Sequence, residues 1–514
     1  MAKTKLDMSL GNPLHPFRSA ARHAFAQAAK DLNVYRFMKQ GLSDPEIRRT
    51  YEAISDHFTA RGIQPPDWSG LPFSHFTMTG GGTTEAYNLV IRLLADDVRE
   101  ENRSRSRNIK PAILMPVPTY GFFTNPAMRE GIEVISINRD METGQITAQQ
   151  LKDAILKADA DGFRIVAYFD SNPNNPLGTI RNEAQTRELA DVFLAARRFY
   201  QKKDDDALKA WQETQAPIKT KMFDKEYEIK PGHVWNGPAS RIRIIDDMVY
   251  DGLEYGDRKA FAFAQIPEIY KDTFTLAGPS KAGLVSVRGG IVIGHDRDIA
   301  SIEKMRMENN YFPPRPTLAA MEAFYSMKEP FKAAREHHMA RLNRDHRMRG
   351  LFMKALINGI DTVDEATADD KKKIISTYAR LEGCSRKDAI DALRKDIPGI
   401  RVVSRPEAGF FHMIDFSALH GHTYPAPNGG WDKPFKDNYS MIGLLDYQNI
   451  GSCTAAWMGI KDNELMTRVT FALPFEDILE YTRRLRRVVA MTKPPAPAKE
   501  NTPAGSCCTA APTL

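Results

Sequence analysis

The chain has 514 residues, of which 42% are hydrophobic and 26% are charged, and its formal net charge at pH 7 is +6. This length exceeds what one hydrophobic core usually supports, so we expect more than one folding unit. The composition is close to that of soluble globular proteins and excludes a wholly disordered chain, while the small net charge argues against nucleic-acid binding.

Cysteine content and hydropathy indicate where such a protein would be found. The four cysteines, at positions 384, 453, 507 and 508, lack the paired spacing of a metal site. A reduced compartment therefore fits best, and no metal is expected. The N-terminus has no apolar stretch typical of a secretory signal, and no later run approaches the ~18 apolar residues of a membrane span. We expect a cytoplasmic protein that does not bind membranes.

The first part of the chain has helical periodicity. Alanine, phenylalanine and leucine recur at helical spacing over 19–32, and a second amphipathic run covers 46–58 after a break at Gly41, Asp44 and Pro45. The segment 74–98 then has the pattern of a short strand, a glycine turn and a helix with an apolar face.

Three apolar segments farther along predict buried strands. They cover 112–118, 165–171 and 242–247, and each is bounded by turn residues. Helical segments such as 188–199 alternate with them. This alternation is typical of a mostly parallel sheet with helices on its faces. We therefore expect an α/β domain.

Two charged stretches interrupt this order, at about 201–237 and 361–394, and we interpret both as exposed insertions. Beyond residue 396, strand-like and helical segments predict a separate α+β unit that ends with a helix over 479–489. The last residues are rich in proline, alanine and threonine, which predicts a disordered tail. The expected division is an arm at 1–45, a large domain at 46–325, a small domain at 326–490 and the tail at 491–514.

Lys281 is the first candidate for chemistry. It lies between two apolar strand-like segments, where partial burial would be costly for a charged amine unless a site uses it. Desolvation lowers the pKa of a lysine, and a neutral amine can form a Schiff base with an aldehyde. A lysine in such a loop is more often an exposed surface residue. Whether Lys281 is functional therefore has to be judged from the neighbouring motifs.

Polar residues follow two other predicted strands. The motif SNPNNPLGT, which contains Asn175, ends one strand, and IIDDMVY, which contains Asp247 and Tyr250, ends another. The carboxyl ends of parallel strands share one edge of a sheet, where α/β proteins bind ligands. An aspartate that faces a pyridine nitrogen keeps that nitrogen protonated, and an amide and a phenol suit the phenolate oxygen of such a ring.

An anion site is predicted at the glycine turn. Gly82, Thr83 and Thr84 precede a helix, whose free backbone amides and dipole attract an anion such as a phosphate. The turn has neither the GxGxxG spacing of dinucleotide folds nor a P-loop lysine. Arg288, seven residues after Lys281, offers a guanidinium suited to the same phosphate.

Taken in this order along the chain, these motifs resemble the class I and II aminotransferases of fold type I. The resemblance runs from SLGNP at 9–13 to TRVTFALP at 467–474. It implies a large domain with a central, mostly parallel seven-stranded sheet flanked by helices, and a smaller α+β domain built from the N-terminal arm and the C-terminal part. It also implies pyridoxal 5′-phosphate as the cofactor and amino acids and 2-oxo acids as substrates.

The resemblance assigns a role to each candidate residue. Lys281 would form the Schiff base and shuttle a proton, Asp247 would pair with the pyridine nitrogen, and Asn175 and Tyr250 would contact the phenolate oxygen. Phosphate contacts would come from Thr83, Thr84 and Arg288, and the stacking aromatic would be Tyr120. Gly82 and Ser280 would also bind the cofactor. Arg468 would clamp the substrate carboxylate, with Gly11 and Asn175 beside it. Tyr35 would reach the phosphate of a partner subunit, because this family usually forms homodimers with shared sites.

Some positions depart from the family pattern. Gly278 stands where relatives often have a phosphate-binding serine, and Ala408 with Gly409 replaces a glycine pair. The first expectation is transamination, and a lyase, cyclase or oxidase that acts on an amino acid is the alternative; NPLGT weakly resembles the aminocyclopropane-carboxylate synthases. A binding protein without catalysis is disfavoured because Lys281 is present, and Asp246 has no assigned purpose.

Overall fold

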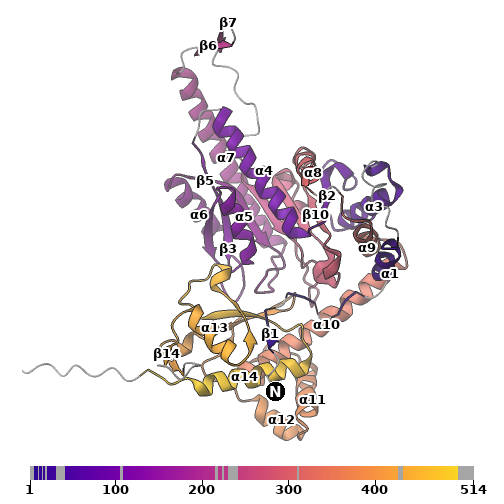
Figure 1. Ribbon diagram of the computed structural model, residues 1–514, viewed down its shortest axis with the longest axis vertical. Coiled ribbons are helices and arrows are strands. Elements are labelled where there is room, and N and C mark those ends of the chain that lie inside the picture. The colour runs from indigo at the N-terminus through magenta and orange to yellow at the C-terminus, as the bar shows by residue number, and fades with distance from the viewer. Residues whose placement is uncertain are drawn as a thin grey trace, which may run out of the picture.

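The computed structural model describes residues 5–9, 11–13, 15–17, 20–30, 41–104, 108–214, 218–222, 225–229, 241–309, 312–425 and 432–495. Figure 1 shows a large domain around a central sheet and a smaller domain packed against one end of it. The small domain carries the C-terminal helices. The predicted fold class, an α/β domain with a smaller α+β domain, is confirmed.

The central sheet has seven strands in the order β2-β10-β9-β8-β5-β3-β4, and all of its strands run in one direction except β10. The sheet is buried on both faces, because successive apolar residues of β3 point into two different cores. The strands are β2 (Phe76–Thr79), β3 (Lys110–Val117), β4 (Glu133–Asn138), β5 (Phe163–Ser171), β8 (Arg243–Asp247), β9 (Thr273–Ala277) and β10 (Gly290–Ile293).

Helices cover both faces of this sheet, as the alternation of strands and helices predicts. One core packs α4 and α8 on the sheet, and the other packs α6 and α7 on its opposite face. The helices of the large domain are α3 (Pro45–Ala60), α4 (Thr83–Ser104), α5 (Thr124–Arg129), α6 (Ala148–Ala160), α7 (Glu183–Thr214), α8 (Asp296–Asn309) and α9 (Arg315–Tyr325).

The break at Asp44 and Pro45 is the start of a helix. The Asp44 carboxylate accepts hydrogen bonds from the backbone amides of Glu46, at 2.8 Å, and of Ile47, at 3.4 Å. These amides have no partner within the helix, and a proline at the first helical position loses nothing. The same residues that interrupt the helical periodicity therefore cap α3.

Helix α7 extends beyond the predicted segment 188–199 and projects from the sheet in Figure 1. The extra turns are anchored by a bidentate ion pair between Arg164 of β5 and Asp204, with N···O distances of 3.0 and 2.7 Å. At the far end of this projection lies an antiparallel hairpin of β6 (Ile218–Met222) and β7 (Lys225–Ile229). The described part of the first charged stretch is therefore a helix and a hairpin.

The second charged stretch, predicted to be an exposed insertion, is packed along one side against the small domain. It forms α11 (Ala368–Glu382) and α12 (Arg386–Leu393), and Ile374 and Leu393 are fully buried in the core of the small domain. Helix α11 begins with a capping box between Thr367 and Asp370. Its charged residues cover the solvent face of a helix whose apolar stripe is packed.

The small domain has a four-stranded antiparallel sheet in the order β11-β12-β17-β16. Its strands are β11 (Arg401–Val402), β12 (Phe411–Asp415), β16 (Cys453–Thr454) and β17 (Met466–Thr470). Two short pairs accompany it: β13 (Thr423–Tyr424) with β14 (Lys433–Pro434), and β15 (Ile450–Gly451) with the N-terminal β1 (Leu6–Asp7). The remaining helices are α10 (Phe331–Asn358), α13 (Asn438–Tyr447) and α14 (Phe475–Met491).

The N-terminal arm contacts both domains. Its first described residues pair through β1 with β15 of the small domain, whereas Phe17 and Ala21 join a core with α3 and α9 of the large domain. The helix α1 (Ala20–Ala28) follows. Residues 11–13 and 15–17 consequently lie between the two domains, close to Lys281.

Candidate functional site

Strand direction brings the candidate residues to one edge of the central sheet. β2, β3, β5, β8 and β9 all end at this edge, and the antiparallel β10 begins there. The candidate residues follow those ends in turn: Gly82 to Thr84 after β2, Tyr120 after β3, Asn175 after β5, Asp247 and Tyr250 at β8, and Lys281 after β9. The edge is the usual position of a ligand site in an α/β sheet.

Lys281 lies in a short 3-10 helix, Pro279–Ala282, directly after β9. Its Nζ donates a hydrogen bond to the backbone carbonyl of Gly11 at 2.7 Å and lies 5.9 Å from the centre of the Tyr250 ring. Burial lowers the pKa of Lys281 to about 8; the positive charges of Arg468 and Arg288 act in the same direction, and Asp247 opposes them. A large fraction of this amine is therefore neutral near pH 8.

Asp247 is the last residue of β8 and is 3% exposed. Its carboxylate accepts one hydrogen bond from the backbone amide of Val249, at 3.3 Å. Burial raises the pKa of Asp247 to about 7, the negative charge of Asp246 adds to the shift, and the Lys281 charge opposes it. This carboxyl is thus poised to exchange a proton near neutral pH.

A hydrogen-bonded chain joins the two domains beside Lys281. The amide of Asn175 donates from Nδ2 to the Tyr250 hydroxyl at 3.2 Å, and its Oδ1 accepts from Arg468 at 3.1 Å. Arg468 comes from β17, donates to the Ser9 carbonyl at 2.8 Å, and stacks 4.1 Å above the Phe411 ring. Arg468 is 4% exposed, and its Nε has no hydrogen-bond partner among the residues that the structure describes.

The glycine turn forms an anion cradle at the N-terminus of α4. Gly82 has a φ of +76°, a conformation that favours glycine, and the turn leads directly into the helix at Thr83. Arg288 donates from Nη2 to the Gly81 carbonyl at 2.9 Å, which places its guanidinium at the same turn. Thr83 is half-buried and Thr84 is exposed. The Arg288 guanidinium therefore lies at the turn that leads into α4.

Close packing explains why Gly278 departs from the family pattern. A Cβ at this position would lie 2.8 Å from the Gly289 carbonyl oxygen and 3.4 Å from the Thr83 side chain. A serine here would require the backbone to move. Ser280 is half-buried in the same loop as Lys281.

Tyr120 lies half-buried at the N-terminus of a short 3-10 helix after β3. The centre of its ring is 5.9 Å from the guanidinium carbon of Arg468. The ring also packs edge-on against Trp457, with 5.2 Å between the two ring centres. Burial raises the pKa of its phenol. The aromatic ring therefore stands beside the proposed carboxylate arginine.

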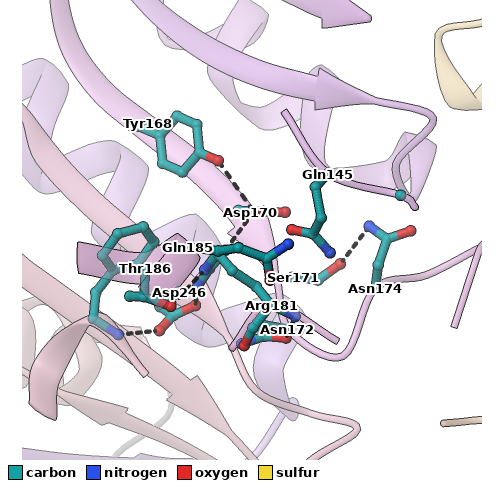
Figure 2. A network of polar contacts seen from close by, with 12 residues as sticks. Gln145, Tyr168, Asp170, Ser171, Asn172, Asn174, Arg181, Gln185, Thr186 and Asp246 are labelled. Atoms are coloured by element: carbon teal, nitrogen blue, oxygen red, sulfur yellow. Dashed lines mark hydrogen bonds and ion pairs between the residues drawn. The ribbon is translucent and has the colours of Figure 1, made fainter. Parts of the chain in front are cut away.

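Asp246 has a role that the sequence did not indicate. Figure 2 shows it in a network with Arg181 and Asp170. Arg181 donates to Asp246 at 3.0 Å and to Asp170 at 2.5 Å, and Arg139 donates to the other oxygen of Asp170 at 2.5 Å. Burial opposes ionisation, but the charges of Arg139 and Arg181 lower the pKa of Asp170. The network links the ends of β5 and β8.

Sequence reasoning missed Arg181, because an arginine six residues after Asn175 does not by itself indicate a buried ion-pair network. Its partners come from two different strands, so a single sequence gives no spacing that would reveal them. Tyr35 lies outside the described residues. Among the residues that are described, no group of three or more histidine, cysteine or acidic side chains could hold a metal ion, and no helix has the length and hydropathy needed to cross a membrane.

The donor set of this edge fits pyridoxal 5′-phosphate. An amine with a lowered pKa, a buried carboxyl with a raised pKa and a glycine cradle with an arginine suit its aldehyde, ring nitrogen and phosphate. Asn175 and Tyr250 offer polar atoms for the phenolate oxygen. The partnerless Nε of the buried Arg468 indicates that this guanidinium has capacity for a further anion.

Comparisons with known proteins agree on the family. The family model for aminotransferase class I and II matches residues 74–199. A 1-aminocyclopropane-1-carboxylate synthase of Glycine max is 30% identical over 127 residues, which is 24% of each chain. A probable aminotransferase of Arabidopsis thaliana is 24% identical over 247 residues, which is 47% of this chain and 38% of the relative. The matching stretch thus spans about a quarter of the soybean protein's own length.

Solved structures share the complete fold at low identity. The aspartate aminotransferase from Rhizobium meliloti superposes with a TM-score of 0.62 and 16% identity, over 96% of this chain and 92% of that one. The aspartate aminotransferase from Thermus thermophilus with maleate gives 0.61 and 14%, over 94% and 92%. At this identity the likeness concerns the fold.

Proposed function

Because the chain belongs to the class I and II aminotransferase family of fold type I, whose members use pyridoxal 5′-phosphate, we propose that it is an aminotransferase. It would move an amino group from an amino acid to a 2-oxo acid. The observation that carries the proposal is the amine of Lys281, which donates to the Gly11 carbonyl at 2.7 Å and has a pKa near 8 that Arg468 lowers and Asp247 raises.

When bound, the cofactor supplies an aldehyde that takes up amino groups and a ring that withdraws electrons from the substrate's Cα. Lys281 would hold it covalently through Nζ. Gly82, Thr83, Thr84, Ser280 and Arg288 would hold its phosphate, Asn175 and Tyr250 its phenolate oxygen, and Tyr120 its ring face. The support for this assignment is that they converge on one sheet edge.

Lys281 can also move a proton. Once its Nζ is free of other bonds, the lowered pKa lets the neutral amine take the proton from the substrate's Cα near neutral pH. The carbonyl of Gly11, 2.7 Å away, accepts a hydrogen bond from this amine and orients it. The same group would later return the proton.

Asp247 would hold a proton close to the ring nitrogen. Its own pKa of about 7 means that the carboxyl binds a proton readily in this buried place. A neighbouring cation would stabilise the ionised carboxylate, as the Lys281 charge already does in part. Asp247 therefore favours a positive charge at its side.

Arg468 would bind the α-carboxylate of the substrate. Its guanidinium is held by Asn175 and the Ser9 carbonyl, and Nε remains without a partner. A planar guanidinium binds carboxylate with two parallel hydrogen bonds. Gly11 lies next to the site, because a Cβ there would lie 3.2 Å from Lys281 Nζ.

Two wider expectations belong to the same proposal. We propose a homodimer with shared sites, in which Tyr35 would contact the phosphate of the partner subunit. We also propose a cytoplasmic location. Equilibrium sedimentation and fractionation of cells would test these two statements separately.

Transamination is tested by one half-reaction without a second substrate. The holoenzyme is mixed with an excess of an amino acid, and the absorbance of the bound cofactor is followed. A transaminase leaves the amine form of the cofactor, so the visible band disappears and returns when a 2-oxo acid is added. A panel of amino acids that all leave the band unchanged would contradict the proposal.

A lyase like the 1-aminocyclopropane-1-carboxylate synthases is the second candidate. This candidate is supported by the likeness to the Glycine max protein of that name, which is 30% identical over 127 residues. A cyclase or oxidase would begin with the same loss of a proton from Cα. In the half-reaction, an enzyme of these kinds consumes the amino acid and regenerates the starting band without an added 2-oxo acid.

A further inference from the structure

Three aromatic side chains form a rim beside the site. Tyr120 and Phe122 follow β3 in the large domain, and Trp457 comes from the small domain. The Trp457 ring lies 5.2 Å from Tyr120 and 4.8 Å from Phe122, edge-on to both. Phe122 is 53% exposed. An exposed aromatic side chain in a cluster next to a site is typical of a binding surface.

Backbone packing fixes this rim across the domain boundary. The Thr119 amide donates to the Met458 carbonyl at 3.1 Å. A Cβ at Gly121 would lie 2.0 Å from the Trp457 carbonyl oxygen and 2.8 Å from its ring. Only a glycine permits this approach. The rim is therefore a built feature rather than a chance contact between loops.

The rim lies next to Arg468 and is backed by a buried apolar cluster. Met413 of β12 and Cys453 of β16 stand opposite Arg468 in the antiparallel register. Directly opposed residues share one face of a sheet, so both side chains flank the arginine. Met413, Met458 and Leu177 are fully buried in one apolar cluster, with Cys453 and Trp457 packed against it.

Among the residues that the structure describes, three charged groups shift the pKa of Lys281: Arg468, Asp247 and Arg288. The proposed function gives the first to the α-carboxylate, the second to the ring nitrogen and the third to the phosphate. A substrate carboxylate or ammonium on the side chain would face the aromatic rim instead.

We propose that the substrate is an amino acid with an aromatic or large apolar side chain, which packs on the Tyr120, Phe122 and Trp457 rim while Arg468 holds its α-carboxylate. This proposal rests on the proposed function, because it takes the carboxylate position from it. The side chain is bonded to the same carbon as the carboxylate, and the Tyr120 ring centre lies 5.9 Å from the Arg468 guanidinium.

Unreactive carboxylic acids test the rim without any chemistry. Calorimetric titration of the holoenzyme compares 3-phenylpropanoate with succinate and 5-aminopentanoate, which carry an aromatic, an acidic and a cationic end. The expected result is binding of 3-phenylpropanoate that is about tenfold tighter than that of the other two.

Variants locate the effect. Phe122→Ala and Trp457→Ala should each weaken 3-phenylpropanoate binding by about fivefold and leave propanoate, which lacks the ring, within about twofold. Phe199→Ala is the matched control, because this phenylalanine is 43% exposed on α7 and should change nothing. Gly121→Ala should act like Trp457→Ala, since it displaces the tryptophan.

The outcomes separate this inference from the function on which it rests. Tighter binding of succinate or 5-aminopentanoate, or equal losses in Phe122→Ala and Phe199→Ala, would overturn the rim as a specificity surface while leaving transamination standing. If 3-phenylpropanoate binding follows the rim variants but no amino acid converts the cofactor, the rim stands and the proposed reaction falls.

Discussion

Asp246 and Asp247 are neighbours on β8, yet their side chains lie on opposite sides of the sheet edge in very different surroundings. Asp246 accepts from Arg181 and from the Phe263 amide, and it belongs to the paired network in Figure 2. Asp247 accepts a single bond from a backbone amide, at 3.3 Å. Both are buried, but only Asp246 has a cation within hydrogen-bonding distance.

This difference separates stability from reactivity. A buried carboxylate that is paired and hydrogen-bonded resists any change of charge, because removing its partner leaves an uncompensated ion. A buried carboxylate with few partners keeps a raised pKa and can gain or lose a proton. One strand end thus supplies a fixed support on one side and a titratable site on the other.

The largest effect is expected at Lys281. Lys281→Ala removes the amine that would bind the cofactor and move the proton, so turnover should fall by about 10⁴-fold, and the visible band of the lysine-bound cofactor should disappear. Lys271→Ala, which alters an exposed lysine earlier on the same chain segment, is the control. An unchanged spectrum in Lys281→Ala would show that Lys281 does not bind the cofactor.

The network around Asp246 is tested through the free energy of unfolding. Arg181→Met leaves Asp170 and Asp246 buried without their shared cation, which should cost about 3 to 5 kcal/mol of unfolding free energy. Urea unfolding of the apoprotein measures this loss. Arg187→Met removes an exposed ion pair with Glu183 and should cost less than about 1 kcal/mol. Equal losses in both variants would show that the network is not a support.

The sequence predicted the fold class and the position of the sheet edge for a simple reason. Parallel strands have their carboxyl ends on one side, so residues that follow β5, β8 and β9 must converge there whatever the distance between them in the chain. Lys281, Asp247 and Asn175 could be placed in this way. Their roles remain proposals, but their proximity follows from strand order.

Contacts between distant segments were beyond this reasoning. Arg139, Asp170 and Arg181 meet through tertiary packing, and nothing in their spacing distinguishes them from surface charges. The same applies to Trp457, which reaches Tyr120 from the other domain. The packing of the charged stretch around α11 was not predicted, because the composition of its solvent face obscured Ile374, which is buried in the core.

A pH dependence of stability sharpens the comparison at Asp247. Its pKa of about 7 in the folded state lies above the ordinary value of 3.8, so the folded apoprotein binds a proton between these values that the unfolded chain releases. Stability should therefore fall as the pH rises from 4 to 7, by about 3 to 4 kcal/mol, relative to Asp247→Asn, which lacks the titration. Unfolding in urea at several pH values gives this difference.

The control for that measurement is Asp257→Asn, at an exposed position. Its stability should run parallel to that of the wild type over the same pH range. If Asp247→Asn also runs parallel to the wild type, the carboxyl of Asp247 is ordinarily ionised, and the two sides of the strand end are alike.

The smallest effect concerns the amine that faces Asp247. The pKa of Lys281 is about 8 rather than 10.5, so the rate of cofactor uptake by the apoprotein should rise about tenfold per pH unit below pH 8 and level off above it. Arg468→Gln removes a positive charge that lowers this pKa and should move the midpoint upward by about half a unit. Arg405→Gln, which alters an exposed arginine of the small domain, should leave it in place. A pH midpoint near 10.5 in the wild type would mean that Lys281 is fully hydrated. The amine beside Asp247 would then not be reactive near neutral pH.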